Sequence, residues 1–283
     1  MKSAVRPLLA IAMLAAVSAG TASASPRAES TYYVSVGDSA AAGFEPIGRF
    51  SHGYANQLYR EVREEIPGLR LTKLGCPGET TDTMIKGGIC QYQMGSQLRE
   101  AVAFLQAHRG HVEFITIDIG ANDWLDACFD GILIDVECTK EILPDVSAGL
   151  QTILGRLRAA APGVPIVGMS YWDPFLGFWV LAPAHGPDIA RQDEAAEEVV
   201  NAGLLDAYKD DGATVADVAG PDFFDSANFS DMVWTEKWGK IPVNVAKACA
   251  WTWFCSANYT LDPHPNTVGY GVIAEAIEEV LDL

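Results

Sequence analysis

The sequence predicts an α/β protein in which helices cover both faces of a parallel sheet. Short apolar segments alternate with longer segments whose apolar residues recur at helical spacing. Alternation of this kind, with strands as apolar as residues 112–119, is expected of a parallel sheet covered on both faces. The chain contains no internal repeat and no linker rich in Pro, Gly and Ser, so we expect one domain after the N-terminal segment.

The N-terminal half predicts three strands separated by two helices. Residues 32–36 form a β-prone run that ends in a glycine, and residues 53–66 follow with an apolar residue at every fourth position. Residues 69–74 predict the second strand. Residues 96–108 place three apolar side chains on one helical face, and the almost continuously apolar residues 112–119 predict the third strand.

The C-terminal half continues this alternation. A helix over residues 146–160 ends at an Ala-Pro-Gly sequence, and residues 164–169 predict the fourth strand. We expect a long helix over residues 188–210, a short strand over 214–218 and a closing helix over 267–281. In such sheets ligands bind at the carboxyl ends of the strands, so that edge is where a functional site is expected.

The N-terminus has the features of a secretory signal. Lys2 and Arg6 precede an apolar run over residues 8–17, and small residues follow at 22–24. We expect cleavage after Ala24, which leaves a secreted, extracellular domain of residues 25–283. A retained membrane anchor is the alternative, but the small-residue site favours cleavage. No later run of 18 apolar residues exists, so no stable membrane insertion is expected.

The charge of the chain restricts its partners. The formal net charge is −18 at pH 7, and the signal segment contributes basic residues only. An acidic surface repels phosphate backbones, which argues against nucleic acid as a partner. It also argues against simple electrostatic docking on anionic lipid. We expect a monomer that acts on a small-molecule or lipid substrate.

The cysteines predict disulfides. An even number of cysteines behind a secretory signal is typical of a disulfide framework. Spacing alone favours three close pairs, although fifteen connectivities are possible. A metal site is the alternative, but no C-x-x-C or H-x-x-x-H spacing supports it, so we expect no metal. The six residues are Cys76, Cys90, Cys128, Cys138, Cys249 and Cys255.

Four short polar segments are expected to converge on one edge of the sheet. Three follow predicted strands, namely 37–39 (Gly-Asp-Ser), 75–78 (Gly-Cys-Pro-Gly) and 120–123 (Gly-Ala-Asn-Asp). The fourth, 262–266 (Asp-Pro-His-Pro-Asn), directly precedes the last predicted helix. Each segment alone is more typical of an ordinary turn. The four together, in this order, indicate a catalytic site.

This set of residues suits acyl transfer. A serine hydroxyl such as that of Ser39 is a weak nucleophile until an adjacent base takes its proton, and a neutral imidazole such as that of His264 can do so. The developing oxyanion needs preorganised donors. The N–H of Ser39, the N–H of Gly78 and the side-chain amide of Asn122 are the candidates.

On these residues the chain resembles the SGNH hydrolases, also called GDSL esterases and lipases. Residues 37–39, 120–123 and 262–266 match the first, third and fifth sequence blocks of that family. The glycine within residues 74–80 matches the second block. The resemblance implies a flavodoxin-like three-layer α/β/α sandwich and a mechanism without a cofactor. It further implies that Ser39 and His264 are catalytic and that Gly78 and Asn122 complete the oxyanion hole. The three close cysteine pairs resemble those of secreted bacterial lipases and phospholipases of the family.

One position departs from the family pattern. Many members carry an acidic residue three positions before the histidine, where this chain has Leu261, and Asp262 is only two positions before it. Two hypotheses follow. Either the carboxylate of Asp262 orients His264, or a backbone carbonyl does so.

Two clusters of aromatic residues bear on the kind of substrate. The first follows the fourth predicted strand, over residues 171–181, and the second contains Trp234, Trp238, Trp251, Trp253 and Phe254. They could form a trench for an acyl chain or simply pack in the core. We therefore predict a secreted serine lipase, esterase or phospholipase. The alternatives are a carbohydrate O-acetyl esterase on the same fold and a catalytically inactive secreted binding protein.

Overall fold

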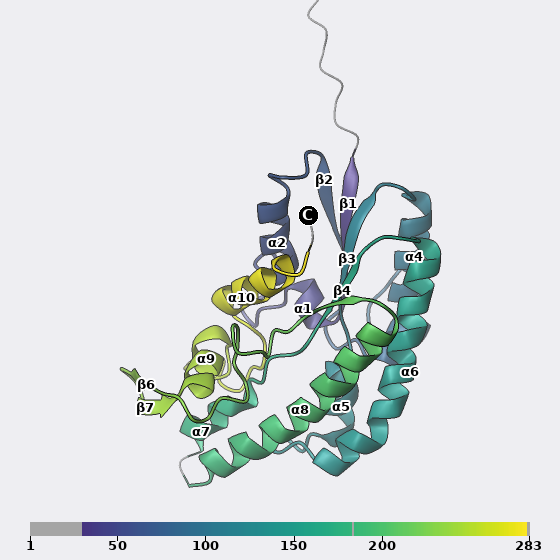
Figure 1. Ribbon diagram of the computed structural model, residues 1–283. Coiled ribbons are helices and arrows are strands. Elements are labelled where there is room, and N and C mark those ends of the chain that lie inside the picture. The colour runs from purple at the N-terminus through teal and green to yellow at the C-terminus, as the bar shows by residue number, and fades with distance from the viewer. Residues whose placement is uncertain (1–29, 183, 282–283) are drawn as a thin grey trace, which may run out of the picture.

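The computed structural model describes residues 30–182 and 184–281, and its centre is a five-stranded parallel sheet (Figure 1). The strand order is β2-β1-β3-β4-β5. The fold class predicted from the sequence is therefore confirmed. The expected signal segment, residues 1–24, lies outside the described residues. The strands are β1 (Thr31–Gly37), β2 (Leu69–Lys73), β3 (Val112–Asp118), β4 (Ile166–Met169) and β5 (Thr214–Ala216).

The strand order places the switch point of the sheet between β1 and β3. The chain moves from β1 outward to β2 and then returns to the other side of β1 as β3. In the register of this pair, Tyr33 lies opposite Phe114, and Gly37 lies opposite Asp118 at the carboxyl end. Ligand sites of open α/β sheets lie at such a switch point, so β1 and β3 are the strands whose ends matter for function.

Helices cover the two faces of the sheet, as Figure 1 shows. One face is covered by α2 (Tyr54–Val62) and α10 (Thr267–Glu278). The other is covered by α4 (Gln97–Ala107), α6 (Val136–Ala160) and α8 (Gly186–Asp210). Their apolar faces meet the buried strands to form one continuous core.

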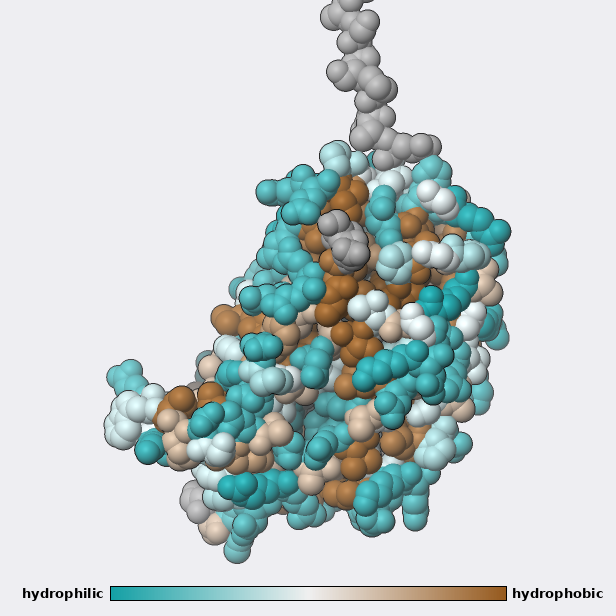
Figure 2. Space-filling view, in the orientation of Figure 1, coloured by the Kyte–Doolittle hydropathy of each residue, from teal (hydrophilic) through white to brown (hydrophobic). Residues whose placement is uncertain are grey.

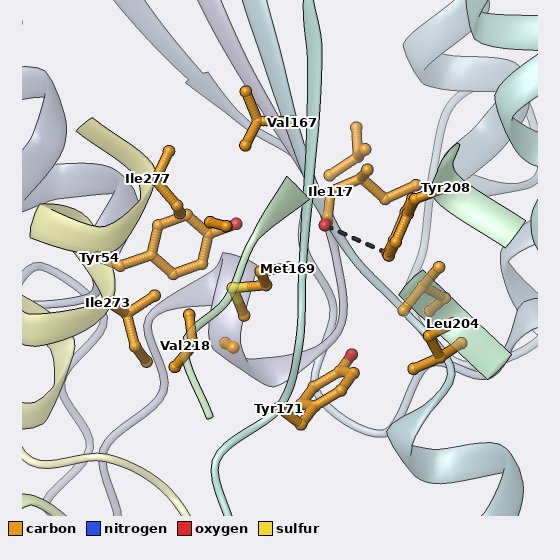
Figure 3. Packing of buried hydrophobic residues seen from close by; sticks show 14 of the residues in the cluster. Tyr54, Ile117, Val167, Met169, Tyr171, Leu204, Tyr208, Val218, Ile273 and Ile277 are labelled. Atoms are coloured by element: carbon orange, nitrogen blue, oxygen red, sulfur yellow. Dashed lines mark hydrogen bonds between the residues drawn. The ribbon is translucent and has the colours of Figure 1, made fainter. Parts of the chain in front are cut away.

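Figure 3 shows how side chains from both helical layers meet the sheet. Tyr54 of α2 and Ile273 of α10 lie on one side of it, and Leu204 and Tyr208 of α8 lie on the other. All four side chains are fully buried. The hydroxyl of Tyr208 donates a hydrogen bond of 3.3 Å to the backbone carbonyl of Ile117, so its polar atom is satisfied inside the core.

Helix α6 begins ten residues before the predicted start at residue 146. The Asp135 carboxylate accepts hydrogen bonds from the N–H groups of Glu137 and Cys138 and caps the helix. Pro144 then lies inside the helix, where proline usually interrupts the hydrogen-bond ladder. The predicted start at residue 146 lies after this proline, so the prediction missed the first ten residues of the helix.

The structure contains short elements that the sequence analysis did not predict. They are helices of three to nine residues and one hairpin, too short to show a clear hydrophobic period. Figures 1 and 2 show that the hairpin projects from the body of the molecule. These elements are α1 (Ser39–Ala42), α3 (Thr81–Lys86), α5 (Ala121–Cys128), η1 (Phe175–Gly177), α7 (Phe178–Leu181), β6 (Met232–Thr235), β7 (Gly239–Pro242) and α9 (Val243–Trp251).

Three disulfides join the cysteine pairs that lie close in sequence. The bonds are Cys76–Cys90, Cys128–Cys138 and Cys249–Cys255. The first closes the loop that follows β2, the second joins the end of α5 to the first turn of α6, and the third spans the end of α9. Across residues 30–182 and 184–281, no helix combines the length and apolar character needed to cross a bilayer.

Helix α8 carries a buried acid, Asp193. One of its carboxylate oxygens accepts a hydrogen bond of 3.0 Å from the N–H of Ile134. The other is buried without a hydrogen-bond partner among the described residues. Burial raises the pKa of Asp193 to about 7 because the ionised form loses its hydration.

This raised pKa predicts a dependence of stability on pH. Between pH 4 and 7 native Asp193 keeps a proton that the unfolded chain has lost, so its contribution to the free energy of unfolding is present at pH 4 and declines as the pH rises. Asp193→Asn should remove the decline. We expect the difference in unfolding free energy between wild type and variant to fall by about 3–4 kcal/mol from pH 4 to 8, measured by denaturant titration. The exposed Asp188 of the same helix provides the control, and a pH-independent difference would contradict the prediction.

Candidate active site

The carboxyl end of β1 forms a turn that requires glycine. Gly37 has a φ of 138°, and a Cβ atom added to it would lie 1.9 Å from the carbonyl oxygen of Asp118. The next residue, Asp38, caps α1 by accepting a hydrogen bond of 2.9 Å from the N–H of Ala40. Ser39 is the first residue of α1, where a backbone N–H has no carbonyl acceptor within the helix. This N–H is therefore available to a ligand.

Buried acids hold this turn in place. Asp118, at the end of β3, accepts hydrogen bonds of 3.1 Å from the N–H groups of Asp38 and Ala41 and a further one from the hydroxyl of Tyr54. Asp38 accepts a hydrogen bond of 2.6 Å from the hydroxyl of Tyr171. Burial raises the pKa of both acids, and the negative charge of Asp38 raises that of Asp118 further. The turn that precedes Ser39 is therefore held by a buried network of hydrogen bonds.

Ser39, His264 and Asp262 form a chain of hydrogen bonds. The Oγ atom of Ser39 lies 2.9 Å from Nε2 of His264. Nδ1 of the same imidazole lies 2.9 Å from Oδ1 of Asp262. That oxygen also accepts a hydrogen bond of 3.0 Å from the backbone N–H of His264. Of the two hypotheses for the orienting group, this geometry favours the carboxylate over a backbone carbonyl.

The backbone before Asp262 explains how an acid two positions before the histidine reaches it. Leu261 has a φ of 70°, in the left-handed region that residues other than glycine seldom adopt. Its N–H donates to the carbonyl of Phe254, and the N–H of Asp262 donates to that of Tyr259, which fixes this turn. The turn aims the Asp262 side chain at the imidazole.

The loop carrying His264 is fixed on both sides. The indole N–H of Trp172 donates a hydrogen bond of 2.9 Å to the carbonyl of Pro263, and the N–H of Trp253 donates one of 2.9 Å to the carbonyl of His264. The ring of Phe44 lies 4.6 Å from the imidazole, measured between ring centroids. These contacts hold the imidazole in its position beside Ser39.

Besides the N–H of Ser39, two donors were predicted for the oxyanion hole, and the structure places one of them in the pocket. Asn122, in the first turn of α5, lines the pocket with Ser39 and His264, and its amide donates a hydrogen bond of 2.9 Å to the carbonyl of Glu79. Its second N–H remains for a substrate. Gly78 lies on the same loop as Glu79 and is exposed, with a φ of 82°, but it is not among the pocket-lining residues.

Gln97 is a positioning residue that the sequence analysis missed. This buried side chain accepts a hydrogen bond of 2.6 Å from the N–H of Gly37 and donates one of 2.8 Å to the carbonyl of the same residue. It also donates to the carboxylate of Glu79. It therefore joins the end of β1 to the Gly78 loop. A glutamine at the start of a helix gives no signal of this role in the sequence.

A largely apolar pocket opens beside Ser39. It encloses about 100 Å³, and its walls include Trp124, Leu125, Tyr171, Trp172 and Phe175. The first predicted aromatic cluster therefore contributes to the pocket. The second does not line it, since Phe254 is packed in the core and Trp234 is 80% exposed.

The described residues contain no group of three or more His, Cys, Asp or Glu side chains placed to hold a metal ion. The site geometry is instead that of a serine hydrolase. It consists of a hydroxyl, an imidazole and a carboxylate linked by successive hydrogen bonds, with a side-chain amide and a helix N-terminus beside them.

Comparisons with known proteins give the family. A model of the GDSL-like Lipase/Acylhydrolase family matches residues 35–272, so the chain belongs to this family and is a carboxylic ester hydrolase. The extracellular lipase of Streptomyces rimosus has a similar structure, with 16% identity, a TM-score of 0.56, and coverage of 89% of this chain and 100% of that one. Phospholipase A1 of Streptomyces albidoflavus NA297 is also similar in structure. It has 17% identity and a TM-score of 0.56, with coverage of 89% of this chain and 100% of that one. No curated protein matches the chain.

The amide of Asn122 can be tested separately. We expect Asn122→Ala to lower kcat about 10²–10³-fold with little change in KM, because a donor that acts on the oxyanion stabilises the transition state more than the bound ester. Steady-state kinetics on a soluble ester measure both constants. Asn228→Ala, whose side chain is not among the pocket-lining residues, is the control, and an unchanged kcat in Asn122→Ala would exclude this amide from the oxyanion hole.

Proposed function

We propose that the protein hydrolyses esters through an acyl-enzyme intermediate on Ser39. The observation that carries the proposal is the pair of 2.9 Å contacts that link Ser39, His264 and Asp262. His264 takes the proton of the hydroxyl as Oγ attacks the ester carbonyl, and it gives that proton to the departing alkoxide. It then takes a proton from water as the water oxygen attacks the acyl carbon, and it gives this proton to Oγ of Ser39 as the Oγ–acyl bond breaks and the acid leaves.

The oxyanion formed in both steps needs donors on one side of the carbonyl. The N–H of Ser39, the amide of Asn122 and the N–H of Gly78 are the three groups that we assign to it. Gly78 can approach a ligand closely because nothing lies within 4 Å of the position a Cβ atom would take.

We infer that the substrates are lipid-like esters and that the protein is secreted. The aromatic walls of the pocket suit an acyl chain. Two structurally similar proteins are a lipase described as extracellular and a phospholipase A1. The three disulfides are typical of proteins outside the cytosol. Sequencing the N-terminus of the exported protein tests this point, with Ser25 as the expected first residue.

The test of the proposed function is a chain-length series. The purified domain of residues 25–283 is assayed on p-nitrophenyl esters from acetate to palmitate, with Ser39→Ala as the matched control. Turnover that depends on Ser39 supports the proposal, and a maximum at long chains supports a lipase. Turnover of acetylated sugars but not of longer esters would favour a carbohydrate O-acetyl esterase. Absence of turnover and of labelling by a fluorophosphonate would overturn the proposal in favour of a binding protein.

A further inference from the structure

Two polar atoms buried beside the active-site pocket have no hydrogen-bond partner among the described residues. They are Nε1 of Trp124 and Oε2 of Glu197. Both side chains line the same pocket as Ser39, and they are only 3% and 2% exposed. Leaving such groups unpaired destabilises the native state, and each unpaired buried group therefore calls for an explanation. Because both side chains line the pocket beside Ser39, a ligand bound there could supply the missing partners.

Both side chains are fixed by the fold. Trp124 lies on α5 two residues after Asn122, so the helix that positions the oxyanion donor also positions the indole. Glu197, on α8, accepts a hydrogen bond of 3.3 Å from the amide of Asn201 through Oε1. The Asn201 side chain in turn bonds both the N–H and the carbonyl of Tyr171, at 2.8 and 2.9 Å. Glu197 is thereby linked through Asn201 to Tyr171 of the pocket wall, and its Oε2 atom has no partner among the described residues.

The charge state of Glu197 restricts the ligand. Burial raises the pKa of this carboxyl well above its usual range, and the neighbouring carboxyls of Asp173, Glu194 and Asp193 raise it further. A neutral carboxyl both donates and accepts, whereas the indole N–H of Trp124 only donates. A hydroxyl group complements both, because its oxygen can accept from the indole N–H while its O–H donates to Oε2 of the carboxyl. An alkyl group satisfies neither atom, and an ammonium group cannot accept from the indole.

We propose that Trp124 and Glu197 form a hydroxyl-recognition pair, and that the preferred substrates are esters with a hydroxyl group near the scissile bond. This inference rests on the proposed ester hydrolysis at Ser39 and narrows its substrate class. The shared chemistry is the hydroxyl, which the acyl part or the alcohol part of the ester can supply. The apolar remainder of the pocket packs against the carbon chain that carries it.

The experiment compares matched esters that differ only in hydroxyl groups. Ethyl 3-hydroxybutyrate against ethyl butyrate tests the acyl side, and 2,3-dihydroxypropyl butyrate against propyl butyrate tests the alcohol side. We expect the hydroxylated member of at least one pair to have a kcat/KM at least about tenfold higher, since sites built to bond a hydroxyl discriminate strongly against analogues that lack it. The pair that responds identifies which side carries the hydroxyl.

Substitutions then assign the preference to the two side chains. Trp124→Phe deletes the N–H, and Glu197→Gln keeps the size and the contact with Asn201 while changing the polar group. Each substitution should reduce the kcat/KM of the hydroxylated ester relative to that of its unhydroxylated partner by at least about fivefold. Both variants should unfold at a temperature near that of wild type. Trp238→Phe and Glu198→Gln are the matched controls, because both side chains lie outside the pocket lining and their variants should keep the wild-type ratio.

Three outcomes would overturn the inference. Ratios within twofold of unity for both pairs, with hydrolysis still dependent on Ser39, would overturn it and leave the proposed function intact. A preference for butyrylcholine over all four esters, lost in Glu197→Gln but kept in Trp124→Phe, would replace the hydroxyl with an organic cation. No turnover of any ester would overturn the proposed function and this inference together.

Discussion

Ser39→Ala is expected to lower kcat about 10⁶-fold, and His264→Ala to lower it by a similar factor. The two side chains act as a unit, since Nε2 of His264 lies 2.9 Å from the Oγ atom whose proton it takes. The double variant should therefore lose no more than either single variant. Residual hydrolysis from the oxyanion donors and substrate binding should remain in all three. Single-turnover kinetics with an activated ester measure these rates.

The control for this prediction is stability. Within residues 30–182 and 184–281 the hydroxyl of Ser39 forms hydrogen bonds only with the side chains of His264 and, at 3.5 Å, Asp38, so its removal should shift the unfolding free energy by less than about 1 kcal/mol. Labelling by a fluorophosphonate should disappear in Ser39→Ala. Activity above one per cent of wild type in a folded Ser39→Ala variant would exclude Ser39 as the nucleophile.

The second large effect is expected at Asp262. Asp262→Ala should lower kcat about 10⁴-fold, because the imidazole loses both its orientation and the charge that stabilises its protonated form. Asp262→Asn should retain roughly tenfold to a hundredfold more activity than the alanine variant. The backbone N–H of His264 donates to the same carboxylate oxygen as Nδ1, so the amide oxygen of asparagine is favoured at that position. Orientation then survives while the charge is lost.

The comparison of these variants also distinguishes the two hypotheses for the orienting group. If a backbone carbonyl orients His264, Asp262→Ala should retain more than a tenth of the activity of wild type. Equal losses in the alanine and asparagine variants would show instead that charge, rather than orientation, is the contribution of Asp262. Both variants are assayed on the ester that wild type hydrolyses fastest.

The sequence predicted the sheet because short β-prone segments alternate with helical ones, and β1, β3 and β4 are largely apolar and buried. That pattern placed residues 37–39 and 120–123 at strand ends, and the structure brings Ser39 and Asn122 together with His264 in one pocket. Their roles stay predictions until the variants are measured. Gly78 shows the limit of motif matching, since the matching glycine lies on the right loop but outside the pocket lining.

The parts that sequence analysis missed depend on contacts between distant residues. Asp118 appeared as a polar interruption in an apolar strand, and only the fold shows that it holds the turn before Ser39. Glu197 appeared as one of several acids on an amphipathic helix. Its burial and its place in the pocket lining arise from the packing of α8 and cannot be read from local periodicity.

The three disulfides have a consequence for how the chain matures. Each joins cysteines that are consecutive in the chain, with separations of 14, 10 and 6 residues. Of the fifteen possible connectivities, this one requires no cysteine to bypass another. Each bond can therefore close as its own segment emerges, without waiting for the strands to assemble. Oxidation and sheet formation are thus separable events, and no disulfide topologically ties one helical layer of the sandwich to the other.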